Sequence, residues 1–347
     1  MNTSHRLATL ALLLVGLFVA PGQARAADPT PAETSKADPK KEVAATKARA
    51  EKGDAEAQNN MGSHYYMGEG VEKNYVEAAN WLRKAAQQDH AEAQNRLGFF
   101  YANGLGVNED YAEALKWFRK AADQNYAKAQ FNLGGLYFFG RGVPKDYAEA
   151  LKWFRKAADQ KHVDAQYRLG MLFLNGQGVN QDYAEAAQWF RRAADQKKAA
   201  AQCNLGVLYS NGQGVEKDYA EALKWFRKAA DQNYAKAQFN IGVLFANTRG
   251  VEKDYAEALK WYRMAADQGH AHAQHNLGVL FANGLGVRTN YAEAYAWCSL
   301  AAGGSPEAAQ AVRLLEDKLS VDELLGSRKR IKELRAMIDA KMNAASK

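Results

Sequence analysis

The segment GHAHAQH places three histidines close together, at positions 270, 272 and 275. A helix would bring His272 and His275 to one side, because they are three residues apart, and imidazole is a common zinc ligand. The corresponding segments elsewhere in the chain carry glutamate, lysine, aspartate or alanine at the position of His272. We therefore interpret His270, His272 and His275 as packing or surface residues, with a zinc site as the alternative, and assign no metal and no cofactor.

Paired carboxylates, which general acid–base catalysis uses, occur in seven equivalent copies. In each copy an aspartate or asparagine stands three residues before a glutamate. This is the pattern of a helix start, where the first side chain caps the helix and the glutamate returns to the backbone amide of the cap residue. The pairs are Asn74/Glu77, Asp110/Glu113, Asp146/Glu149, Asp182/Glu185, Asp218/Glu221, Asp254/Glu257 and Asn290/Glu293. Because capping explains them all, we predict no catalytic residue and a protein that is not an enzyme.

The elements that position these groups form a repeat. The segment DYAEALKWFRKAADQ occurs three times, at 110–124, 146–160 and 218–232. Rows of 36 residues that begin at Ala55 and end at Pro306 keep seven copies in register, and all seven tryptophans fall in one column. A period of this size is typical of a solenoid, in which each unit buries its apolar face against its neighbours.

Each row predicts two helices joined by a glycine turn. In the third row, helix A covers 127–139, the segment GRGV reverses the chain, and helix B begins after Asp146. A glycine in the middle of every helix A, such as Gly134, weakens the helix by about 1 kcal/mol relative to alanine. Its presence in every row predicts a close approach to the helix B that carries the tryptophan.

The end of helix B varies from row to row. Gly269, Asn125 and Asn233 fit a left-handed C-cap, because glycine and asparagine tolerate that conformation. Lys161 and Lys197 stand at the same place in other rows and fit it poorly. The sequence therefore predicts a regular helix start and a less regular helix end.

These residues resemble a known family. The pattern AxAQxxLGxLYxxGxGVxxDYAEAxxWFRKAA over residues 55–306 is similar to the Sel1-like repeat, a helix–turn–helix relative of the tetratricopeptide repeat. The resemblance implies an all-α fold, a right-handed α-solenoid of seven 36-residue repeats. Residues 42–54 are expected to form an N-terminal capping half-repeat and residues 307–347 C-terminal capping helices. Thr248 replaces the first loop glycine of row six, where we expect local strain.

The N-terminus predicts export. Residues 1–26 carry positive charge, the short apolar run LATLALLLVGLFVA and the small-residue motif Ala24-Arg25-Ala26, which together are typical of a cleaved signal peptide. No cysteine follows the apolar run for lipid attachment, and no later segment has the roughly 20 apolar residues of a membrane span. Residues 27–41 are rich in proline and predict a flexible linker. We expect a periplasmic or secreted protein that does not span the membrane.

Charge and cysteine content indicate no further site. With 46 basic and 39 acidic residues the chain is mildly basic, and basic pairs such as Arg119 and Lys120 recur on helix B among acidic neighbours. We interpret these pairs as a solvated face and expect no nucleic-acid partner. The two cysteines, Cys203 and Cys298, stand at different positions of the repeat, so we expect buried thiols without a disulfide.

The positions that vary between rows carry the functional prediction. In tetratricopeptide-like arrays helix A lines a concave groove, so the resemblance implies that its variable side chains face a partner. Asparagine and arginine can hold a peptide backbone or a carboxylate, and aromatic side chains supply contact area. The predicted partner-binding residues are Phe131, Asn132, Tyr167, Arg168, Asn204, Phe239, Asn240, His275 and Asn276. We therefore expect a non-enzymatic adaptor or scaffold that binds a protein or peptide in this groove.

Three alternatives stay open at this point. The same side chains could be half-buried packing residues, with binding elsewhere on the surface. The aromatic residues would also suit peptidoglycan or another cell-envelope glycan. Some secreted, cysteine-rich Sel1-repeat proteins are associated with penicillin binding and β-lactamase activity, but they carry a cysteine pair in most repeats, whereas this chain has two cysteines.

Overall fold

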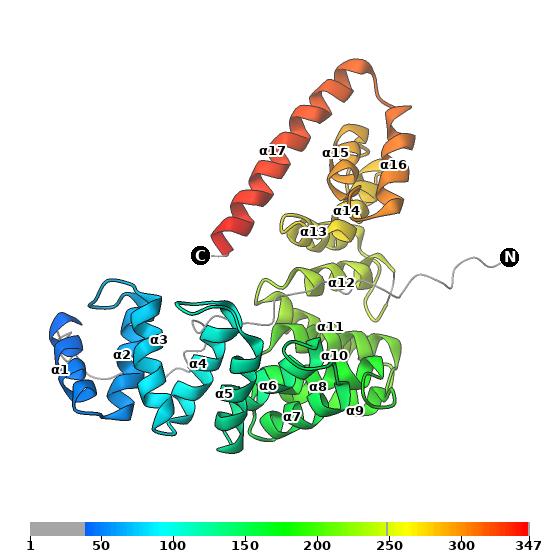
Figure 1. Ribbon diagram of the computed structural model, residues 1–347. Helices are drawn as coiled ribbons and strands as arrows, with labels where there is room; N and C mark the ends of the chain where they lie inside the picture. Colours follow the sequence, from blue (N-terminus) through cyan, green and yellow to red (C-terminus); the bar gives the residue numbers. More distant parts are fainter. Residues whose placement is uncertain (1–38, 248, 346–347) are drawn as a thin grey trace, which may run out of the picture. The chain divides into compact units, whose positions relative to one another are not determined.

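The computed structural model describes residues 39–247 and 249–345 (Figure 1). Within these residues the chain forms 17 α-helices and no strands, which confirms the predicted all-α class. The chain divides into two compact units, one ending at Lys145 and one beginning at Asp146. The predicted signal peptide, most of the predicted linker and Thr248 lie outside the described residues.

The first unit contains six helices, and the second contains eleven. The helices of the first unit are α1 (Pro39–Glu51), α2 (Ala55–Met67), α3 (Tyr75–Gln87), α4 (Ala91–Asn103), α5 (Tyr111–Asp123) and α6 (Ala127–Phe139). Those of the second unit are α7 (Tyr147–Asp159), α8 (Val163–Asn175), α9 (Tyr183–Asp195), α10 (Ala199–Asn211), α11 (Tyr219–Ala230), α12 (Ala235–Ala246), α13 (Tyr255–Ala266), α14 (Ala271–Asn283), α15 (Tyr291–Ala301), α16 (Pro306–Glu316) and α17 (Val321–Ala345).

The helices follow the predicted order of helix A and helix B. The even-numbered helices α2 to α14 are the helices A, and the odd-numbered helices α3 to α15 are the helices B. Within each unit, a helix A packs on the helix B of its own repeat and on the helix B of the preceding repeat, as α10 does on α11 and α9. This confirms the tandem helix–turn–helix array.

The glycine in the middle of helix A marks the closest approach between the two helices of a repeat. A Cβ atom at Gly206 would lie 2.7 Å from the ring of Phe226 and 3.1 Å from the carbonyl oxygen of Ala222, both on helix B. The corresponding glycines 62, 98, 170, 242 and 278 meet helix B in the same way. The predicted close approach is therefore confirmed, and its partner is the residue after the tryptophan.

The start of helix B confirms the predicted cap and corrects the role of the glutamate. Asp110 Oδ1 accepts the backbone N–H groups of Ala112 and Glu113 at 2.9 and 3.0 Å. The N–H of Asp110 itself donates to the carbonyl of Tyr101 on helix A, so it is not available to the glutamate. Glu113 Oε2 instead accepts the indole Nε1–H of Trp117 at 3.1 Å. The glutamate therefore satisfies a buried tryptophan donor rather than the backbone.

The end of helix B differs from the prediction. Lys161 and Lys197 adopt the left-handed conformation, with φ of 63° and 64°, as do Asn125 and Asn233. Next to Lys197, the N–H of Lys198 donates to the carbonyl of Ala193, which draws the chain back over the helix end. The short connection to the next helix A thus imposes this conformation even where the residue is a lysine.

A buried glutamine on helix A ties together the ends of two helices B. Gln202 is 3% exposed, its Nε2 donates to the carbonyl of Ala194 at 3.1 Å, and its Oε1 accepts from Nε2 of Gln232 at 2.8 Å. Gln58, Gln94 and Gln166 make the same two bonds. Buried polar groups of this kind are costly unless they are paired, so the network requires the repeats to stack in register.

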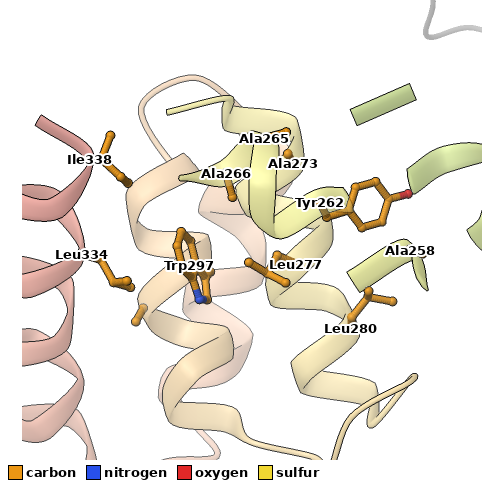
Figure 2. Close-up of a cluster of buried hydrophobic side chains, with 11 residues drawn as sticks. Ala258, Tyr262, Ala265, Ala266, Ala273, Leu277, Leu280, Trp297, Leu334 and Ile338 are labelled. Carbon is orange, nitrogen blue, oxygen red and sulfur yellow. The ribbon is translucent and has the colours of Figure 1, made fainter. Parts of the chain in front are cut away.

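The last helix, α17, covers the final helix B of the array. Leu334 and Ile338 of α17 pack in one buried cluster with Trp297 of α15, which is fully buried (Figure 2). Arg330 Nε lies 2.7 Å from Glu293 Oε1, and Lys341 Nζ lies 2.9 Å from Asp267 Oδ2. α17 thereby joins the seventh repeat to the end of the sixth. Among the described helices, none has the length and apolar character needed to cross a membrane.

Candidate functional site

The predicted partner-binding residues lie on helices A, in both units. Phe131 and Asn132 belong to α6 in the first unit, and the other seven lie on α8, α10, α12 and α14 in the second. In the second unit they are the two residues directly after the buried glutamine, and Cys203 completes the set. We call this set the helix A face: Tyr167, Arg168, Cys203, Asn204, Phe239, Asn240, His275 and Asn276.

In the first unit the two predicted residues are engaged within the fold. Phe131 is 8% exposed, so the expectation of an exposed aromatic side chain is wrong at this position. Asn132 is half-buried, and its Nδ2 donates to Oδ1 of Asn95 on α4 at 2.9 Å. The position after the glutamine is therefore buried in this repeat, whereas Tyr167 and Phe239 at the same position are half-buried.

In the second unit the aromatic members of the helix A face are half-buried. The ring of Tyr167 lies 5.8 Å from that of Phe190, and burial raises the pKa of its phenol. The ring of Phe239 stacks on His270 at 4.8 Å and lies 6.2 Å from His272. Each aromatic side chain therefore packs on one side and keeps part of its surface exposed.

The asparagine side chains join the helices A to one another through weak acceptors. Asn204 Nδ2 lies 3.3 Å from Sδ of Met171 on α8, and Asn240 Nδ2 lies 3.5 Å from Sγ of Cys203 on α10. Sulfur is a weak hydrogen-bond acceptor, so these contacts hold the amides in place without using their full capacity. The helix A face is thus continuous from α8 to α12 and retains strong donors and acceptors.

Arg168 is the charged member of the helix A face. Its side chain is half-buried, and it makes no hydrogen bond or ion pair with any residue that the structure describes. Burial lowers the pKa of Arg168 from its ordinary value, while Asp164 and Tyr167 oppose that shift. A guanidinium with five N–H donors and no protein acceptor is ready to bind an anionic group.

The three histidines at 270, 272 and 275 have separate roles. Nδ1 of His270 accepts the backbone N–H of Ala273 at 3.2 Å and so caps α14, as His90 caps α4 and His162 caps α8. His272 is exposed, and Nδ1 of His275 is buried without a hydrogen bond. Over residues 39–247 and 249–345, no three His, Cys, Asp or Glu side chains are arranged to hold a metal ion.

The basic pairs of helix B pack on aromatic rings. Lys228 Nζ lies 3.8 Å from the ring centre of Trp225, and Lys156 Nζ lies 4.2 Å from that of Trp153. The first residue of the pair reaches the next repeat, where Arg191 contacts the hydroxyl of Tyr209. These cations therefore cover tryptophans and link repeats, and the surface of helix B uses much of its charge within the fold.

The cysteines are free and buried, as expected. Burial raises the pKa of Cys203 and of Cys298 to about 11, so both thiols stay protonated near neutral pH. A protonated, buried thiol is a poor nucleophile. Cys203 acts in packing and as the acceptor of Asn240.

The family model of the Sel1 repeat matches the chain seven times, at residues 55–90, 91–126, 127–162, 163–198, 199–234, 235–270 and 271–304. A Sel1 repeat protein from Oxalobacter formigenes is 36% identical, with a TM-score of 0.64 over 70% of this chain and 96% of that chain. A protective antigen of uropathogenic Escherichia coli, c5321, which displays an SLR fold, is 26% identical, with a TM-score of 0.52 over 89% of this chain and 90% of that chain. No curated protein matches the sequence.

Proposed function

The chain belongs to the Sel1 repeat family, and we propose that it is a non-enzymatic adaptor that binds a protein or peptide partner along the helix A face. Sel1 repeats form a scaffold fold that commonly serves protein interaction. The observation that carries the proposal is the line of incompletely used polar groups and half-exposed aromatic side chains on α8, α10, α12 and α14.

The other side of the repeat offers fewer unused groups. On helix B, the glutamates at 149, 221 and 257 bind the lysines at 152, 224 and 260, three residues further on. The second member of each basic pair lies over a tryptophan. A partner would have to break these ion pairs and cation–π contacts before it could bind the same charges. The polar groups of the helix A face can bind a partner without the loss of such contacts.

A helix A face that is already formed lowers the cost of binding. Its side chains are held by packing and by weak hydrogen bonds, so few of them need to be ordered when a partner arrives. Amide groups can pair with the backbone of an extended segment, and the exposed parts of Tyr167 and Phe239 add apolar contact area. The proposed place of action is the periplasm or the exterior of the cell, on the basis of the signal-like residues 1–26.

An affinity capture from cell-envelope extract tests the proposal. The full chain is compared with Tyr167→Ala/Asn204→Ala/Asn240→Ala and with a control, Lys152→Ala/Gln188→Ala/Lys224→Ala, which changes one exposed residue on each of three successive helices B. We expect a partner protein that the wild type and the control retain and the first variant loses, with all three melting temperatures alike. Equal capture by the first variant, or capture of glycan in place of protein, would contradict the proposal.

A further inference from the structure

Arg96 and Arg168 occupy the same position of the repeat, two repeats apart, but only one of them is neutralised. The Nη2 atom of Arg96 lies 2.7 Å from Oε1 of Glu92, and its Nη1 atom contacts Oγ of Ser63. Arg168 has neither contact and no other hydrogen bond or ion pair among the described residues. The chain therefore contains a matched pair, in which Arg96 is satisfied internally and Arg168 is not.

The sequence explains the difference. The residue four positions before Arg168 is Asp164, whose carboxylate stands one methylene closer to the helix than that of Glu92. Asp164 Oδ1 is taken by Nζ of Lys198, at 2.6 Å.

The surrounding charge is complementary to an anion. The helices α8, α10, α12 and α14 contain one carboxylate, Asp164, which is already paired. They carry the cations Arg168 and Lys236, while Lys198 at the start of α10 is paired with Asp164. Cations gathered on one side of the repeat raise the local concentration of acidic ligands and speed their association.

The groups beside Arg168 suit a peptide that carries such an anion. Tyr167 precedes it on α8, and the side chain of Asn204 on α10 lies near Tyr167. A guanidinium binds a carboxylate through two parallel N–H donors, which sets both position and orientation. Amides and an aromatic ring within the same face can then hold the adjoining backbone and side chains.

We infer that the partner of this protein is an acidic peptide segment, one of whose carboxylates binds to Arg168. The inference rests on the proposed function, because it names the chemistry of the ligand for the same helix A face. The carboxylate belongs either to an aspartate or glutamate side chain or to the C-terminus of the partner. Both sources present the same planar pair of oxygens to the guanidinium.

Selection from a random heptapeptide library displayed with free C-termini, on the immobilised full chain, tests the inference. We expect enriched peptides that contain aspartate or glutamate, or that share a C-terminal residue. Arg168→Gln should weaken their binding about tenfold or more, Arg168→Lys should weaken it less, and the matched control Arg96→Gln should change it less than about twofold. Synthetic peptides with an amidated C-terminus, or with glutamine in place of glutamate, identify which carboxylate is bound.

The outcomes separate the two proposals. Enriched peptides that lack acidic residues, or that bind Arg168→Gln as well as the wild type, would overturn the inference and leave the adaptor function standing. A selection that enriches no peptide would also overturn the inference, whereas the adaptor function is overturned only by the affinity capture described above. Because Arg168 makes no hydrogen bond or ion pair with the described residues and glutamine keeps most of its aliphatic packing, we expect Arg168→Gln to fold with a melting temperature close to that of the wild type, which keeps a loss of binding interpretable.

Discussion

Gln232 donates a hydrogen bond of 2.8 Å from its Nε2 to Oε1 of Gln202, thirty residues earlier in the same repeat. Gln202 passes the connection on to the preceding repeat through the carbonyl of Ala194. Two side-chain amides thus link the ends of α9 and α11 across α10. The repeats are therefore held in register by a polar network as well as by apolar packing, and the rigid array places the helix A face.

The glutamine network predicts that an apolar side chain of similar size cannot replace Gln202 without a loss of stability. Gln202→Met keeps the side-chain size but leaves the carbonyl of Ala194 and the amide of Gln232 without a partner. We expect a loss of about 1 to 3 kcal/mol, measured by hydrogen exchange of α9 to α11, because a repeat array need not unfold in one step. The control Gln87→Met, on an exposed position of α3, should change stability by less than about 0.5 kcal/mol. A loss as small as that of the control would show that the network is energetically neutral.

The close approach at Gly206 predicts that Gly206→Ala destabilises the protein. The new methyl would lie 2.7 Å from the ring of Phe226, and the strain of about 1 to 3 kcal/mol should outweigh the gain of about 1 kcal/mol in helix propensity. The smaller side chain of Phe226→Leu in the same chain should relieve part of that cost. Urea unfolding of the two single variants and the double variant measures the coupling, and purely additive effects would contradict the predicted contact.

The left-handed lysines predict a stabilising substitution. Lys197 has a φ of 64°, a conformation that costs a residue with a Cβ atom about 1 to 2 kcal/mol and costs glycine almost nothing. After the larger chain entropy of glycine is subtracted, Lys197→Gly should stabilise the protein by about 0.5 to 1 kcal/mol in thermal or urea unfolding. Gly269 has the same place in the sixth repeat and a φ of 80°, so Gly269→Lys should destabilise it by a similar amount. A stability change of opposite sign in either variant would refute this explanation.

The capping role of His270 predicts a specific pH dependence. Burial, together with the nearby side chains of His272 and Lys236, lowers its pKa from 6.5 to about 4. Because the fold favours the neutral ring, stability is complete above pH 6.5 and falls as the pH drops toward 4, by at most about 3 kcal/mol. His270→Asn retains a cap without a titrating group and should remove this part of the pH dependence. An NMR titration of His270 with a midpoint near 6.5 would contradict the prediction.

The repeat period made most of the fold predictable from the sequence. The third helix A was predicted over 127–139 and is found at Ala127–Phe139, since one helix start and one glycine turn recur in every row. The role of Glu113 could not be predicted in the same way. Its choice between the amide of Asp110 and the indole of Trp117 depends on a carbonyl from another helix, which only the packed structure places.

The candidate site was less predictable than the fold. The residue type at 168 indicated a polar group on helix A, but its lack of an internal partner depends on Lys198, which draws away the carboxylate of Asp164. Phe131 shows the opposite error, because its column also holds half-exposed residues and its burial follows from packing rather than from the repeat pattern. Column positions therefore predict which face a residue occupies, and its neighbours decide whether the side chain is available.

Photo-crosslinking in the source cells tests the central claim most directly. A photoreactive amino acid replaces one of two exposed residues in the full chain. The first is Lys236 on α12, which is a helix A, and the second is Gln188 on α9, which is a helix B. The adaptor function predicts a crosslinked protein or peptide partner from position 236 and none from position 188, and the acidic-peptide inference predicts in addition that Arg168→Gln reduces the adduct. Adducts from position 188 with none from position 236 would place binding on helix B and contradict the claim.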